Sequence, residues 1–353
     1  MTPRENLLSL FRRRGYESAP VEFGLCPSPE EEYRRQTGSP LPYPEYFRFP
    51  WEYVPGLKLP PCTVDWTRYY DRQFAPNTQF SNWGVAHEPG EGTFHMSRMH
   101  HPMERFDSLE QFQAYPYPDY AAGDGGHMAG TATAIRQRGL AAGAGQACTI
   151  WETAWYMRGM EQLMMDMMTD SELAVYHLDR VTEQACIMAA AYARAGVDFI
   201  QFGDDIGMQQ TIMMSERLYR TWLKPRLARV IATARAIKPD LVVAYHSCGY
   251  VIPFIPDLIE VGVDVLNPVQ PECMDFAAVH AEFGERLSFW GTLGTQTTLP
   301  FGSPEEVRQM VHRNLGIAGK KGGLLCSPTH MVEPEVPWAN LMAYVAACRE
   351  WRP

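Results

Sequence analysis

The sequence lacks the features that mark membrane, secreted and nucleic-acid-binding proteins. No run of 18 apolar residues occurs, which argues against a membrane span. The first sixteen residues are charged and contain no apolar core segment, so we expect no signal peptide. Acidic residues outnumber basic ones by 41 to 31, and the only basic triplet, at 12–14, is interpreted as the solvated end of a first helix. Nucleic acid is therefore a poor candidate partner.

Two further patterns are missing. The eight cysteines have irregular spacings in a chain too long to need disulfides, so we expect reduced thiols and a cytoplasmic location. No phosphate-binding G-x-G-x-x-G motif follows any predicted strand, which disfavours a doubly wound dinucleotide-binding sheet.

What is present divides the chain into two unlike halves. Residues from about 26 to 120 are rich in Pro, Tyr and Trp and show no long helical period. We interpret them as an irregular cover or lid. Within it, the alternating segments 63–70 and 92–99 predict a β-ribbon or an extended cover.

The second half alternates regularly between apolar runs and amphipathic stretches. The strand-like runs lie at 147–155, 197–205, 241–249, 263–270, 286–295 and 322–330. Helices are predicted after them, most clearly at 171–194, at 215–237 and after Ser303, which begins a capping box with Glu306. A strand in "APVEFGL" near residue 20 and one more in the irregular half bring the total to eight. Repeated strand–helix units predict an α/β fold, a TIM (β/α)8 barrel formed by residues 1–353 as one domain, with an elaborated N-terminal cover.

Polar residues end five of the predicted strands, and in a TIM barrel chemistry takes place at those carboxyl ends. The strand-end residues are Asp204 and Asp205, His246 and Cys248, Asn267 and Gln270, Thr292 and Gln296, and Cys326 and His330. A single polar strand end would mean little, but five at one end of the barrel predict a site.

A zinc site is the most specific hypothesis. His246 and Cys248 are two residues apart on a strand and so point to the same face, and imidazole with thiolate is a zinc ligand set. Cys326 occupies the matching position at the end of a later strand. Three protein ligands leave a fourth position open, as catalytic zinc requires. The alternative is structural zinc in a binding protein, with Glu152, Asp204 or Glu272 as the fourth ligand.

Several segments together resemble the uroporphyrinogen decarboxylase superfamily, in particular its zinc-dependent, corrinoid-linked methyltransferase branch. They are "WETAWYMRGMEQLMMD", "VDFIQFGDDIGMQ", "HSCG", "VDVLNPVQP", "GTLGTQTTLPFGSPEEV" and "CSPTHMVEPEVPWAN". The resemblance runs from about Pro20 to the C-terminus. It implies a barrel whose zinc ligands are His246, Cys248 and Cys326, and a corrinoid (cobalamin) carried by a partner protein.

The resemblance leaves three reactions open. We favour transfer of a methyl group from a methoxylated aromatic to the corrinoid cobalt, because "GDDIGMQ" and "WETAW" resemble aromatic O-demethylase components. The alternative is transfer from a methylated corrinoid protein to a thiol such as coenzyme M. Uroporphyrinogen decarboxylation is disfavoured, because acidic residues in "APVEFGLCPSPEEEY" (Glu22 and Glu30–Glu32) would repel a polycarboxylate substrate.

Roles follow for the remaining site residues. The residues predicted to be catalytic are Asp204, Asp205, Glu152 and His330, and those predicted to bind substrate are Trp151, Tyr245, Gln270 and Trp290. The chain has no D-x-H-x-x-G motif to ligate cobalt, so a separate corrinoid protein is the expected partner, beside a small methyl donor. The sequence leaves open whether the chain forms a homodimer.

Overall fold

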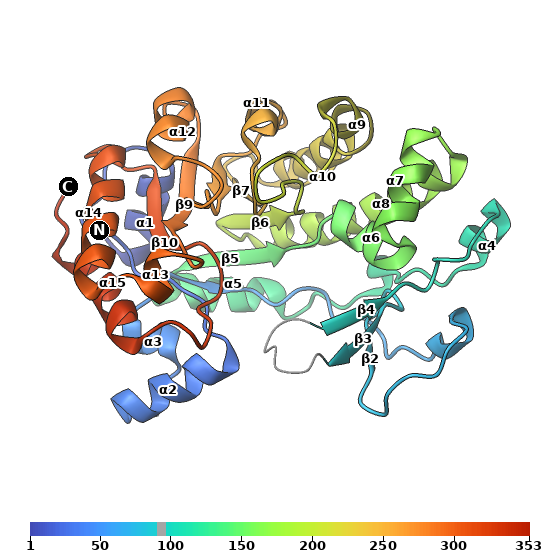
Figure 1. The fold of residues 1–353 in the computed structure, drawn as a ribbon, viewed down its shortest axis with the longest axis horizontal. Coiled ribbons are helices and arrows are strands. Elements are labelled where there is room, and N and C mark those ends of the chain that lie inside the picture. Colours follow the sequence, from blue (N-terminus) through green and yellow to red (C-terminus); the bar gives the residue numbers. More distant parts are fainter. Residues whose placement is uncertain (90–96) are drawn as a thin grey trace.

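A curled parallel sheet surrounded by helices forms the centre of the molecule (Figure 1). The computed structural model describes residues 1–89 and 97–353. The seven strands of the sheet are adjacent in the order β1 (Trp51–Tyr53), β5 (Ala141–Gln146), β6 (Phe199–Gly203), β7 (Val242–His246), β8 (Val265–Asn267), β9 (Ser288–Leu293) and β10 (Leu324–Pro328). All pairs are parallel, so the carboxyl ends of the strands meet at one edge, as in a TIM-like barrel.

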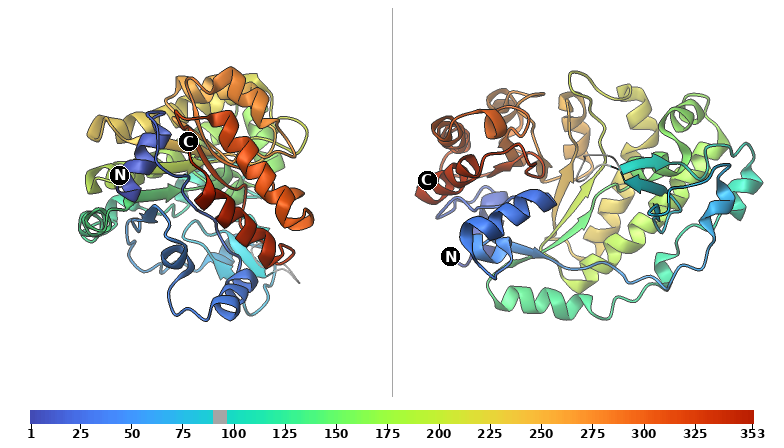
Figure 2. Two further views of the ribbon diagram at one scale, coloured as in Figure 1. Left: turned by 90° about the vertical axis from the view of Figure 1, so that its left-hand side faces the viewer. Right: turned by 60° about the horizontal axis from the view of Figure 1, so that its bottom comes forward.

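Helices cover the outer face of the sheet in both views of Figure 2. Their bounds are α1 (Pro3–Phe11), α2 (Pro27–Thr37), α3 (Tyr43–Phe47), α4 (Leu109–Ala114), α5 (Met128–Gln137), α6 (Trp151–Arg158), α7 (Met160–Met168), α8 (Glu172–Ala195), α9 (Glu216–Trp222), α10 (Lys224–Ile237), α11 (Ile255–Glu260), α12 (Phe276–Phe283), α13 (Thr298–Phe301), α14 (Pro304–Ala318) and α15 (Trp338–Glu350). The predicted capping box at Ser303 is confirmed at the start of α14. None of the described helices is both long and apolar enough to cross a membrane.

The inner face of the barrel is filled by aromatic rings from several strands. Trp51 packs against Phe199 and Trp290, with ring centroids 5.5 and 5.7 Å apart. Side chains of directly paired residues point to the same side of a sheet, so these contacts fix which residues of every strand face inward. Gly143 lies in register with Phe199, and a Cβ at this glycine would stand 2.4 Å from the phenyl ring. The tight packing of the floor therefore requires a small residue in β5.

Two predictions about the strands of the barrel were wrong. The run at 147–155 is not a strand, since α6 begins at Trp151, and the strand is instead the preceding alanine- and glycine-rich β5. The segment 19–25 forms only one bridge, Leu25 to Val332, and its Glu22 amide donates to the Tyr344 hydroxyl rather than to a neighbouring strand. The further strand expected in the irregular half is confirmed as β1, so the predicted cover includes a strand of the barrel sheet.

The rest of the predicted cover contains a small antiparallel sheet beside α6 (Figure 1). Its strands are β2 (Gln79–Phe80), β3 (Ala86–Pro89) and β4 (Ser97–His100). The ribbon predicted at 92–99 overlaps β4, but residues 92–96 lie outside the described part of the chain. The segment predicted at 63–70 is not a strand, because Asp65 caps a short 3-10 helix at Trp66–Tyr69.

A buried ion pair ties this cover to the barrel. Arg158, at the end of α6, is 2% exposed and donates to Asp166 of α7 and to the carbonyls of Met103 and Phe106. The guanidinium of α6 therefore bonds one acceptor in α7 and two in the cover. Removing it would leave a buried carboxylate and two carbonyls without their donor.

We expect Arg158→Met to lower the free energy of unfolding by about 3–5 kcal/mol. Arg180→Met is the matched control, because its partner Glu183 is exposed and such pairs contribute about 0–1 kcal/mol. Thermal unfolding followed by circular dichroism measures both variants. Equal melting temperatures for the two would show that the buried pair does not anchor the cover.

Candidate metal centre

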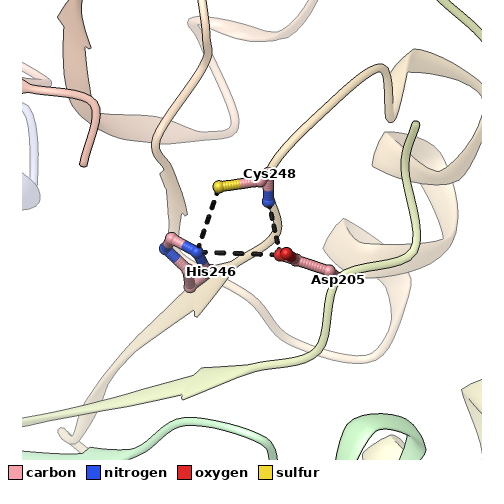
Figure 3. A group of neighbouring side chains, drawn as sticks. All are labelled: Asp205, His246 and Cys248. Atoms are coloured by element: carbon pink, nitrogen blue, oxygen red, sulfur yellow. Dashed lines mark hydrogen bonds and ion pairs between the residues drawn. The ribbon is translucent and has the colours of Figure 1, made fainter. Parts of the chain in front are cut away.

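Three potential ligands meet at the carboxyl ends of β6 and β7 (Figure 3). His246 Nε2 lies 3.5 Å from Cys248 Sγ and 3.7 Å from Asp205 Oδ1. The three ligand atoms all lie within 4.8 Å of one another, and no other group of this kind occurs in the described ranges. The His246 and Asp205 side chains are 25% and 37% exposed, so the cluster remains open to an incoming ligand.

Close backbone packing holds the cluster together. Gly203 pairs with His246, and a Cβ there would stand 2.8 Å from the histidine Cβ. Gly249, with a φ of +86°, turns the chain directly after Cys248 against the loop that follows β6. The Cys248 amide then donates to Asp205 Oδ1 over 2.7 Å. The H-x-C-G sequence therefore positions the carboxylate as well as the two ligands predicted from it.

Asn267 fixes the tautomer of His246. The Asn267 side-chain nitrogen donates to the carbonyl of Trp290 over 2.8 Å, so its oxygen faces the histidine as an acceptor. His246 Nδ1 lies 2.5 Å from that oxygen and must therefore carry the proton. Nε2 is left with its lone pair directed toward Cys248 and Asp205, which is the state that binds a metal.

The donor set fits zinc. Imidazole nitrogen, cysteine sulfur and carboxylate oxygen are all zinc ligands, and a set of three leaves one position open. Burial, followed by the charges of Asp205 and Glu152, raises the pKa of the Cys248 thiol. Without a metal this thiol keeps its proton, whereas a bound cation would stabilise the thiolate.

The two neighbouring aspartates have different surroundings. Asp204 is 3% exposed and accepts hydrogen bonds from the amides of Ile150 and Glu152, so it caps the start of α6. Glu152 in turn accepts from the Asp205 amide over 3.1 Å. Burial, followed by the charge of Asp205, raises the pKa of Glu152. Asp205 and Glu152 thus lie at the cluster, whereas Asp204 supports it from behind.

The predicted third zinc ligand, Cys326, does not join the cluster. In β10, Leu325 pairs with the inward-facing Trp290, so Cys326 faces the opposite side. Its Sγ lies 3.7 Å from the Thr292 hydroxyl, which accepts a hydrogen bond from Asn314 of the outer helix α14. Cys326 is 1% exposed, and burial raises its pKa to about 12. The structure therefore does not bring this predicted ligand to the cluster, because the cysteine faces the helix layer.

The other predicted site residues are dispersed. Trp151 is fully buried, and Tyr245 is 2% exposed with its hydroxyl on the Asp204 carbonyl, so neither lines an open pocket. Gln270 accepts from the Gly249 amide over 2.8 Å and thereby supports the turn after Cys248. Trp290 belongs to the aromatic floor of the barrel, and His330 is exposed two residues beyond β10.

Sequence reasoning missed two polar residues of the barrel interior, Tyr53 and Gln201, and it named Glu22 only as part of an acidic patch. Tyr53 donates to Gln201 over 3.2 Å, and Gln201 donates to the Asn267 oxygen over 3.1 Å. A signal was available, because Glu22 and Gln201 each interrupt an otherwise apolar run. A polar residue within a buried strand usually faces a functional cavity or a partner.

The role of Asn267 leads to a prediction. We expect Asn267→Leu to weaken zinc binding by about 10- to 100-fold, because the histidine loses the acceptor that orients it. Asn314→Leu is the matched control, since this buried asparagine bonds Thr292 on the outer side of the barrel. Competition with a chromophoric chelator measures both affinities. Equal affinities in both variants and the unsubstituted protein would contradict the orienting role.

The protein is an α/β barrel in which a group of potential metal ligands lies at the carboxyl ends of the strands. The uroporphyrinogen decarboxylase (URO-D) family model matches residues 88–351, and the chain belongs to that family. The match begins after β1, so the first 87 residues lie outside it.

Comparison with solved structures shows the same fold in a methyltransferase from Methanosarcina mazei. The two chains are 19% identical, 99% of each is covered, and the TM-score is 0.68. A psychrophilic glycoside hydrolase family 10 endo-beta-1,4-xylanase matches 63% of this chain and 80% of its own at 10% identity, and its TM-score of 0.39 carries no argument. The comparison with curated proteins gives no match.

Proposed function

We propose that this protein is a zinc-dependent methyltransferase that moves a methyl group from a methoxylated aromatic to the cobalt of a partner corrinoid protein. The observation that carries the proposal is the cluster of His246, Cys248 and Asp205, with Nε2 of the histidine free to bind a metal. Zinc bound there supplies Lewis acidity that stabilises negative charge on an ether oxygen. The proposed ligand set differs from the predicted one in that Asp205 replaces Cys326.

Residues of this chain have specific roles in the proposed methyl transfer. The bond between the methyl carbon and the ether oxygen breaks with both electrons on the oxygen, and the methyl group passes to the reduced cobalt. His246, Cys248 and Asp205 would hold a metal that could stabilise the negative charge on that oxygen, while Asn267 and the Cys248 amide keep the ligands in place. Preorganised ligands of this kind need no rearrangement during the reaction.

The interior charges argue against the decarboxylase reaction. Glu22 faces the barrel interior and accepts from Trp290, and Asp205 and Glu152 add two more carboxyl groups. A polycarboxylate substrate would meet like charges there. The predicted acidic patch is split, however, because Glu30–Glu32 lie on α2, where Arg34 and Arg35 pair with two of them. Of the acidic residues predicted to repel the substrate, Glu22 alone faces the barrel interior, where Asp205 and Glu152 add to its charge.

We place the reaction in the cytoplasm, with the corrinoid protein docking over the open end of the barrel. All eight cysteines are unpaired, which suits a reducing compartment. The test is to incubate the zinc-loaded protein with a reduced corrinoid protein and a panel of methoxyarenes and methylated thiols. We expect the methylcobalamin spectrum with methoxyarenes. The opposite result is that the arenes do not react and methylcobalamin methylates added coenzyme M. That result would contradict the proposal and support methyl transfer to a thiol.

A further inference from the structure

Glu22 is a carboxyl group inside the barrel that the proposed metal chemistry does not use. Its neighbours Val21 and Phe23 are buried, and Phe23 packs against the rings of Phe47 and Phe49 on the outer side. The side chain of Glu22 points the other way, and its Oε2 accepts from Trp290 Nε1 over 2.8 Å. Ser327, whose neighbour Cys326 faces outward, also stabilises this carboxylate.

Tyr53 and Glu22 adjoin the same pair of rings in the aromatic floor, because Trp290 donates to Glu22 and packs against Trp51. Tyr53 lies on the same face of β1 as Trp51, and their rings are 4.5 Å apart. Tyr53 is nevertheless 48% exposed, so space remains above the floor.

Hydrogen bonds connect this pair to the candidate metal centre. The Tyr53 hydroxyl donates to Gln201 Oε1, and Gln201 Nε2 donates to the Asn267 oxygen that also receives the proton of His246. Glu22 reaches the same asparagine from the other side, because Trp290 accepts from Asn267 through its carbonyl. A ligand held by Glu22 and Tyr53 would therefore occupy the interior that the metal centre opens into.

The two groups call for a ligand that carries a hydroxyl. Tyr53 has committed its proton to Gln201, so its oxygen can only accept. Glu22 has no cationic partner among the described residues, and burial raises its pKa to about 7. A hydroxyl group can donate to one of these two oxygens, and when Glu22 is protonated it can accept from Glu22 while it donates to Tyr53. An ether can only accept, so a fully methoxylated ring would offer no donor to the Tyr53 oxygen.

We propose that Glu22 and Tyr53 bind a free hydroxyl group of the methyl donor, so that the donors are methoxyphenols rather than fully methoxylated arenes. This inference rests on the proposed function for the identity of the methyl group, but the binding of the hydroxyl can be measured without methyl transfer.

The test compares two ligands that differ by one methyl group. Isothermal titration of the full chain with 2-methoxyphenol and with 1,2-dimethoxybenzene should show about 10- to 100-fold tighter binding of the phenol, as for a hydrogen bond to a charged group. Glu22→Gln retains an acceptor for Trp290 but loses the carboxylate, and should abolish the preference. Glu285→Gln, at a side chain that is 90% exposed, should keep it.

Equal affinities for the two ligands in the unsubstituted protein, or a full preference in Glu22→Gln, would overturn the inference. Methyl transfer to a corrinoid protein, measured on the same samples, separates the two proposals. A Glu22-dependent preference without transfer supports the hydroxyl site and contradicts the proposed function. Demethylation of 1,2-dimethoxybenzene at least as fast as that of 2-methoxyphenol supports the function and contradicts the hydroxyl site.

Discussion

Replacing Cys248 with serine should remove the zinc and with it the methyl transfer. The thiolate is the only sulfur donor of the cluster, and it stands 3.5 Å from the histidine nitrogen. Loss of Lewis acidity worth several kcal/mol corresponds to a fall in rate of about 10³-fold or more. Zinc content by plasma emission spectrometry and the rate of methylcobalamin formation measure the two effects. His246→Ala should behave in the same way.

Cys326→Ser is the matched control, because it removes a cysteine of the same barrel that faces the helix layer. We expect this variant to keep one zinc per chain and most of its activity, with a modest loss of stability at a site that is 1% exposed. Loss of zinc in Cys326→Ser, with retention in Cys248→Ser, would reverse the ligand assignment.

Omitting the corrinoid protein should abolish turnover altogether. The chain contains no D-x-H-x-x-G motif with which to ligate cobalt, so the methyl acceptor must come from a partner. We expect no demethylation of 2-methoxyphenol with the protein alone, slow reaction with free reduced cobalamin, and fast reaction with a cognate carrier. Chromatographic detection of the demethylated product, catechol, measures all three.

The dependence of the reaction rate on salt concentration tests whether the carrier docks by charge attraction. The formal net charge of −10 predicts that a carrier with a basic rim is attracted over long range, so the rate with the carrier should fall as ionic strength rises. The rate with free cobalamin should change less. Demethylation in the strict absence of any corrinoid would contradict the methyltransferase proposal in both directions of transfer.

The regular half of the barrel was predictable from sequence, because five of its strands are apolar runs bounded by turns. Strand β5 was not, since Ala141, Gly143 and Gly145 have little intrinsic strand preference. The small size of Gly143 and Gly145 is explained only by the Phe199 and Tyr53 rings packed over them. Such contacts depend on strand register, which one sequence does not reveal.

The part of the site that lies on one strand and the loop after it was predictable from the sequence. His246 and Cys248 face the same way because they are two residues apart in one strand. Cys326 belongs to a strand that is buried on both faces, so its sequence does not say which residues point inward. The register with β9 decides this, through the pairing of Leu325 with Trp290. The third donor, Asp205, was placed only by the contact of its loop with Cys248.

The central claim is that the metal is bound by one sulfur, one imidazole and one carboxylate. X-ray absorption at the zinc edge of the loaded protein tests this directly, because sulfur lies at about 2.3 Å from zinc and nitrogen or oxygen at about 2.0–2.2 Å. We expect a single sulfur ligand, an imidazole scattering pattern, and loss of the sulfur shell in Cys248→Ser. Two sulfur ligands, with one lost in Cys326→Ser, would contradict it.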